Sequence, residues 1–82
     1  MVKVDVAGEA RNSANTYGIE KKFNDKVDFL KKDPRHKSLN LKPLKSQKAY
    51  KISRFRIDKK YWGLVVKVGP NHLRVIEVVI HL

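Results

Sequence analysis

A regular apolar stripe marks the middle of the first half of the chain. Four large apolar residues recur there at spacings of four, four and three positions: Ile19, Phe23, Val27 and Leu30. This repeat is that of one face of an α-helix, and lysines fill the other faces. Pro34 ends the helix after Asp33, because proline disfavours the α conformation of the residue before it. The pattern therefore predicts one amphipathic helix that packs a single face on a core.

The stretch before this helix has a different pattern. Val2, Val4 and Val6 alternate with polar residues, which is the period of a half-buried strand. We expect a short strand at the edge of a sheet or paired with a later strand. Residues 8–18 show no sustained apolar periodicity and contain several turn formers, so we interpret them as a loop with at most one helical turn.

The second half of the chain predicts three strands. Within residues 50–57 the apolar positions change phase between Ile52 and Phe55, which indicates a β-bulge near Ser53 and Arg54. A phase change of this kind moves the apolar side chains to the other face of the sheet. The first of the three strands is therefore expected to be bent.

The two later strands are separated by turns at 58–60 and 69–71. Residues 61–68 are nearly all apolar, which is typical of a central strand covered on both faces. Residues 73–82 alternate regularly up to the last residue. Because short turns join neighbouring antiparallel strands, we expect these strands to form a meander.

The predicted layout is β-α-β-β-β. It gives an α+β fold of two layers, with one main helix on one face of a small, twisted antiparallel sheet, in a single domain spanning residues 1–82. The connection 34–48 is expected to be extended and basic, with leucines that attach it to the core. Arg54 and Arg56 would then lie on the sheet face away from the helix.

Charge is concentrated in one region. The net charge is +11, and residues 21–60 alone hold 15 Lys or Arg against four Asp, also +11, whereas residues 1–20 sum to −1 and residues 61–82 to +1. Such a field favours a polyanion: nucleic acid, an anionic membrane surface or an acidic protein. The alternative interpretation is a solvated, lysine-rich surface.

Several classes of chemistry are not expected. The chain has no cysteine, which excludes disulfides and thiolate chemistry, and its three histidines lack the spacing of a metal site. We therefore expect no metal and no cofactor. We expect His36 to cap or anchor the loop after the helix, and His72 to be an exposed turn residue.

No apolar run approaches the roughly 20 residues of a membrane span, and no secretory signal is visible, so we expect a cytoplasmic protein.

Three segments resemble a known family. The combination DPRHKSLNLKPLK, YKISRFRI and RVIEVVIHL resembles the RelE/ParE superfamily of bacterial toxins from type II toxin and antitoxin pairs, over residues 19–82. The RelE-like and HigB-like messenger RNA interferases are the most similar branch. The resemblance implies metal-independent cleavage of messenger RNA on the ribosome by attack of the 2′-hydroxyl on the neighbouring phosphate. It also implies a cognate antitoxin as partner.

The resemblance assigns residues to this chemistry. The positions of the family's catalytic residues fall on Lys51, Arg54, Arg56 and His81. The basic residues of the connection would bind the RNA backbone: Arg35, Lys37, Lys42, Lys45 and Lys48. For Trp62 two interpretations stand, stacking on an RNA base and packing in the core.

The chain departs from the family pattern at two places. Relatives usually have a Tyr-Arg pair at the start of the third strand, where this chain has Tyr61, Trp62 and Gly63. Relatives also continue past the last strand with further catalytic residues, whereas this sequence ends at Leu82. These departures keep two alternatives open: a ParE-type toxin directed at DNA gyrase, and a basic RNA-binding protein without catalytic activity.

Overall fold

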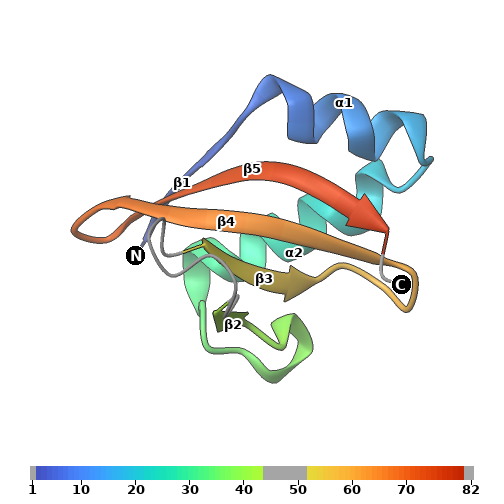
Figure 1. Cartoon of the computed structure of the whole chain (residues 1–82). Coiled ribbons are helices and arrows are strands. Elements are labelled where there is room, and N and C mark those ends of the chain that lie inside the picture. Colours follow the sequence, from blue (N-terminus) through green and yellow to red (C-terminus); the bar gives the residue numbers. More distant parts are fainter. Residues whose placement is uncertain (1, 44–51, 81–82) are drawn as a thin grey trace.

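The structure of the chain is a computed structural model that describes residues 2–43 and 52–80 (Figure 1). The predictions for Lys45, Lys48, Lys51 and His81 fall outside these ranges. The elements follow one another as β1 (Lys3–Val6), α1 (Gly8–Thr16), α2 (Glu20–Lys32), the 3-10 helix η1 (Lys37–Leu39), β2 (Lys42–Pro43), β3 (Ile52–Arg56), β4 (Tyr61–Gly69) and β5 (His72–Ile80).

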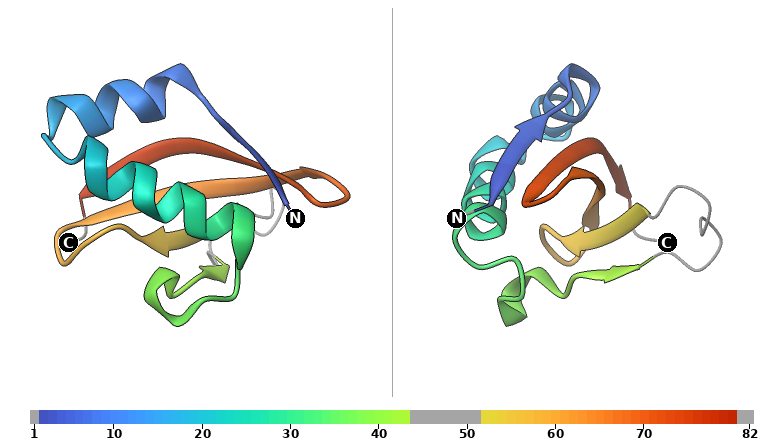
Figure 2. Two further views of the ribbon diagram at one scale, coloured as in Figure 1. Left: turned by 180° about the vertical axis from the view of Figure 1, so that it is seen from behind. Right: turned by 90° about the vertical axis from the view of Figure 1, so that its left-hand side faces the viewer.

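The strands form one sheet in the order β1-β5-β4-β3-β2. Figure 2 shows both helices on one face of this sheet, while the other face carries no helix from residues 2–43 and 52–80. The α+β fold, the edge position of β1 and the central position of β4 are thus confirmed. The sheet is mixed rather than antiparallel, because β1 runs parallel to β5. Alternating valines give no strand direction, so the sequence pattern did not reveal this pairing.

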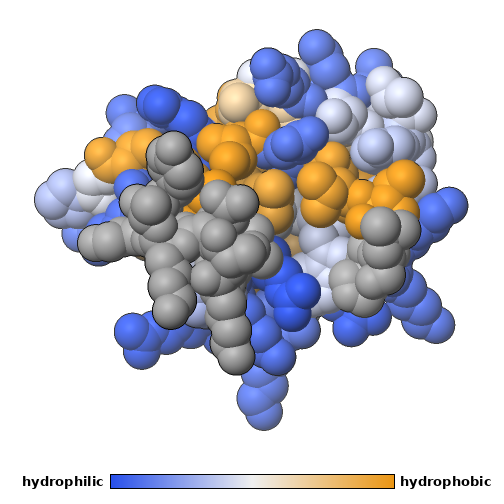
Figure 3. Space-filling model, in the orientation of Figure 1, coloured by the Kyte–Doolittle hydropathy of each residue, from blue (hydrophilic) through white to orange (hydrophobic). Residues whose placement is uncertain are grey.

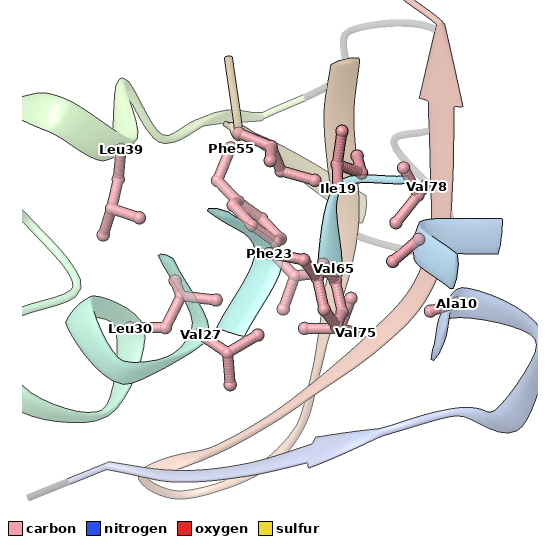
Figure 4. Packing of buried hydrophobic residues seen from close by; sticks show 12 residues of the cluster. Ala10, Ile19, Phe23, Val27, Leu30, Leu39, Phe55, Val65, Val75 and Val78 are labelled. Carbon is pink, nitrogen blue, oxygen red and sulfur yellow. The ribbon is translucent and has the colours of Figure 1, made fainter. Parts of the chain in front are cut away.

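Helix α2 follows the predicted stripe. Phe23 and Leu30 are fully buried, and the helix ends at Asp33 as expected from the proline that follows. Leu39 of η1 is also fully buried and attaches the connection to the core. In Figure 4 these side chains converge with Phe55 and the valines of the sheet. The core is a single layer between the helices and the sheet.

The predicted loop over residues 8–18 is wrong, because most of it forms the nine-residue helix α1. Ala10 and Ala14, one turn apart, are both fully buried and pack α1 against the core. Methyl groups bury little area, so this helix has no stripe of large apolar residues to reveal it. Gly18 then adopts a φ of +70° and turns the chain into α2, a conformation that glycine adopts without strain.

The predicted bulge in β3 is also wrong. The pairing of β3 with β4 runs without interruption from Ile52 opposite Val66 to Arg56 opposite Trp62. Ile52 lies on the open face of the sheet, whereas Phe55 lies in the core. The phase change occurs because the open face is itself partly apolar, so an apolar residue there does not mark the core side.

A bulge lies instead in the pairing of β4 with β5. Leu64 is opposite Glu77, but the next residue, Val65, is opposite Val75, so Ile76 is an extra residue. The bulge shifts the phase of β5. Val75 and Val78 are therefore both buried in the core, although they lie three residues apart.

The edge of the sheet at β1 contains a small polar cluster. His72 Nε2 lies 2.6 Å from Asp5 Oδ2, and Arg74 Nη2 lies 3.5 Å from the same oxygen. His72 is thus not the exposed turn residue that we expected, since its ring pairs with a strand 67 positions away in sequence. The hydrogen bond with His72, the charge of that ring, Lys3 and the bond to Arg74 together lower the pKa of Asp5.

This pKa gives a prediction for acid stability. A carboxyl whose pKa is lowered by folding stabilises the protein above its unfolded pKa of 3.8, and this contribution is lost as the pH falls through the folded pKa. We expect wild type to melt at a higher temperature than Asp5→Asn at neutral pH. This difference in melting temperature should vanish at strongly acidic pH. Thermal melts of both proteins between neutral and strongly acidic pH measure this. A difference independent of pH would contradict the role of the Asp5 charge.

Candidate nucleic-acid interface

The open face of the sheet holds the predicted strand arginines. Phe55 is buried towards the helices, so its neighbours Arg54 and Arg56 point to the opposite face. Residues directly opposite each other on antiparallel strands share a face, which places Lys42 of β2 beside Arg54 and Trp62 beside Arg56. The structure thus places Lys42 directly beside Arg54, on the same face as Arg56.

The guanidinium of Arg54 lies over a neighbouring aromatic ring. Its guanidinium carbon lies 4.7 Å from the centre of the Trp62 ring, which is only 8% exposed. The Arg54 Nε atom is buried and has no hydrogen-bond partner within the described part of the chain. A ring beneath a guanidinium restricts its motion. Two N–H groups of such a guanidinium can then donate to two oxygens of one phosphate. Trp62 therefore acts as a platform for Arg54 and does not itself lie open for a base.

An apolar stripe crosses the middle of the same face. It consists of half-buried side chains from the three long strands: Ile52, Leu64, Val66 and Val79. Figure 3 shows apolar surface across this face with hydrophilic surface above and below it. Glu77, next to Leu64, is exposed and takes part in no ion pair among the residues that the structure describes. The open face thus combines cations with apolar area, which suits both phosphate and protein contacts.

Arg56 also lines a second feature, which we call the basic hollow. It is a depression of about 370 Å³ between η1 and the end of β3. Its walls are formed by Lys26, Lys37, Ser38, Asn40, Arg56, Ile57, Asp58 and Lys59. The predicted RNA-binding residue Lys37 is thereby brought next to the predicted catalytic position Arg56. Sequence reasoning missed Lys26 and Lys59, because single lysines in a chain so rich in lysine give no signal of their own.

A second depression of about 450 Å³ shares Lys37 and Asn40 with the basic hollow and is lined in part by Arg35 and His36. The His36 ring accepts a hydrogen bond from the Ser38 backbone N–H at 3.1 Å and stacks on Phe29 at 4.4 Å. The predicted loop-anchoring role of His36 is thus confirmed. Arg35 and Lys37 both lie exposed along this short segment.

Asp58 is the one carboxylate in the walls of the basic hollow. Burial alone would raise its pKa, but hydrogen bonds from the backbone N–H groups of Lys60 and Tyr61, together with Lys22, lower it overall. These bonds are 2.8 and 2.9 Å to Oδ1, and Lys22 Nζ lies 3.4 Å from Oδ2. The charge of Asp58 is therefore already engaged within its own turn.

Within residues 2–43 and 52–80, no group of three or more His, Cys, Asp or Glu side chains is placed to hold a metal ion. Over the same ranges, no helix is both long and apolar enough to cross a membrane.

Comparison with known proteins gives matches to solved structures. No family model and no curated protein matches the sequence. The YoeB/ParE toxin from Agrobacterium tumefaciens matches with a TM-score of 0.75 and 20% identity, over 98% of this chain and 99% of that chain. A chain of the E. coli DinJ-YafQ complex matches with a TM-score of 0.74 and 10% identity, over 99% of this chain and 94% of that chain. A chain of the YoeB-YefM complex from Staphylococcus aureus matches with a TM-score of 0.71 and 15% identity, over 100% and 99%.

These identities are low, but the matches extend over nearly the whole of each chain. They agree with the resemblance found in the sequence, which rested on other grounds. The chain therefore has the fold of the RelE/ParE toxin superfamily.

Proposed function

We propose that this chain is the toxin of a type II toxin and antitoxin pair and cleaves messenger RNA on the ribosome without a metal ion. The observation that carries the proposal is Arg54, stacked on Trp62 and set beside Lys42 and Arg56 on the open face of a toxin-like fold. Such a protein would act in the cytoplasm.

The chemistry needs three contributions. The 2′-hydroxyl of one nucleotide attacks the adjacent phosphorus, its proton passes to a base, and the leaving 5′-oxygen takes a proton from an acid. Arg54 and Arg56 would stabilise the charge of the pentavalent phosphorane. For the proton transfers we propose Lys51 and His81, at the positions that the family resemblance indicates. Glu77 is a further proton acceptor on the same face.

The antitoxin is proposed to cover the apolar stripe of the open face. Two of the matched structures are complexes, DinJ-YafQ and YoeB-YefM, which supports a protein partner. An amphipathic segment with acidic residues fits best, since apolar contact would supply affinity and the charge of +11 would speed encounter. Such a partner would hide Arg54 and so inhibit the toxin.

Induced expression in a bacterial host tests the proposal. Wild type is expected to arrest growth and to create new 5′ ends in cellular messenger RNA. Arg54→Ala combined with Arg56→Ala should abolish both, since loss of one preorganised charge-stabilising group costs about 10²- to 10³-fold in rate. A matched control replaces Lys21 and Lys32, two exposed lysines of α2, with alanine and should behave like wild type.

The other outcomes identify the alternatives. Growth arrest without new RNA ends would contradict RNA cleavage and favour a toxin directed at gyrase. No arrest by the soluble wild-type chain would favour a basic RNA-binding protein without catalytic activity.

A further inference from the structure

The basic hollow gathers cations that form no ion pair with any residue that the structure describes. Four of its wall residues are positively charged: Lys26, Lys37, Arg56 and Lys59. Within the described part of the chain, the ion pairs are Lys22 with Asp58 and Asp5 with His72 and Arg74. None of the four cations takes part in them. Because Asp58 is engaged by Lys22 and by two backbone N–H groups, the hollow has a large excess of positive charge.

The wall at η1 is fixed rather than loosely placed. Leu39 is fully buried beneath it, and Asn40 adopts a left-handed conformation with a φ of +47° that closes the turn. The Asn40 N–H donates to the Lys37 carbonyl at 3.1 Å. From the helix side, Lys26 Nζ donates to the Ser38 carbonyl at 3.3 Å. The hollow is therefore held in shape before any ligand arrives, which lowers the entropy cost of binding.

The lining indicates the class of ligand. Among the described residues that line the hollow, the one apolar side chain is Ile57, which is only 3% exposed, and none is aromatic. A peptide would find no apolar pocket for a side chain here, and a base would find no ring to stack on. Lysine, arginine, serine and asparagine side chains can instead all donate hydrogen bonds to phosphate oxygens.

The hollow shares wall residues with two neighbouring surfaces. Lys37 and Asn40 line both the basic hollow and the second depression, which Arg35 also lines. Arg56 belongs both to the hollow and to the open face. The hollow therefore joins the arginines of the open face to the basic residues around η1.

We propose that the basic hollow binds backbone phosphates of the RNA beside the cleaved bond and so guides the strand across η1. The proposal rests on the proposed function for the choice of RNA as the polyanion. It assigns Lys37 and Lys59, which share the hollow with Arg56, to strand binding and not to the chemical step.

Binding to a short single-stranded RNA with 2′-O-methyl riboses tests this inference apart from catalysis. The methyl group blocks the nucleophile, so the full chain can bind this RNA but cannot cleave it. Affinity is measured by fluorescence anisotropy over a range of salt concentrations. Each phosphate contact on a single strand contributes about 0.7 to the slope of log affinity against log salt, so Lys37→Ala with Lys59→Ala should make the slope shallower by about 1.4.

The control is the exposed pair Lys21→Ala with Lys32→Ala, which removes the same charge from α2 outside the hollow. It should leave the slope close to that of wild type. Equal slopes for the two double variants would overturn the proposal, even if the chain cleaves RNA. Weaker binding of poly-glutamate with unchanged binding of the RNA would also overturn it and assign the hollow to an acidic protein segment. If wild type does not cleave RNA but the slope changes as expected in the Lys37→Ala, Lys59→Ala variant, only the proposed function is overturned.

Discussion

Phe23→Ala is expected to lower the free energy of unfolding by about 3–5 kcal/mol. Phe23 is fully buried at the centre of the α2 stripe, where it contacts the single core layer between helix and sheet. A domain of this size has about 5–15 kcal/mol of stability in total, so the variant should be close to unfolding. Urea denaturation followed by circular dichroism measures the loss.

The matched control is Phe29→Ala on the same helix. Phe29 is only half-buried and stacks on His36, so the same chemical change should cost clearly less there. Equal costs at the two positions would contradict the assignment of Phe23 to the centre of the core.

Gly63→Ala is expected to destabilise the protein by about 1–3 kcal/mol, although it adds a single methyl group. Gly63 lies directly opposite Phe55 on the neighbouring strand, and a Cβ atom at position 63 would come within 2.2 Å of the Phe55 ring. The ring is fully buried among the other side chains of the core. The new methyl group therefore forces the ring or the strand to shift.

A double-mutant cycle isolates this contact. Phe55→Leu removes the far ring atoms that the new methyl group would meet, so Gly63→Ala should cost much less in that background. Unfolding free energies of the four proteins in urea give the coupling. Equal cost of Gly63→Ala in both backgrounds would show that the ring is not what requires glycine at this position.

Large apolar side chains made part of the fold predictable. The stripe of Phe23 and Leu30 gave α2, and the nearly continuous apolar run of 61–68 gave the central strand β4. In both elements the apolar period is long enough to indicate one type of structure. Where burial depends on small groups, as at Ala10 and Ala14 of α1, the pattern is too weak to separate a helix from a loop.

The sequence pattern also could not show which residues pair between neighbouring strands. A phase change shows that a face has switched, but not whether the cause is a bulge or a second apolar face. At Ile52 and Phe55 the cause is the apolar stripe of the open face. A bulge does occur at Ile76, in a strand whose sequence alternates regularly. Only the residue that pairs on the neighbouring strand distinguishes a bulge from a second apolar face.

The candidate site was predictable in composition but not in arrangement. Sequence reasoning selected Arg54, Arg56, Lys37 and Lys42, and the structure places Lys42 beside Arg54 and Lys37 in one hollow with Arg56. The platform under Arg54 was not foreseen, because it depends on the register that sets Trp62 opposite Arg56. The assignments of Lys45, Lys48, Lys51 and His81 remain predictions.

The most direct test of the central claim is cleavage of a messenger by the purified chain on ribosomes, with the cleaved nucleotide supplied in 2′-hydroxyl or 2′-deoxy form. The account predicts that the hydroxyl form is cut, that the product ends in a 2′,3′-cyclic phosphate, and that the deoxy form resists. Cleavage of both forms, or no cleavage of either by the folded chain, would contradict it.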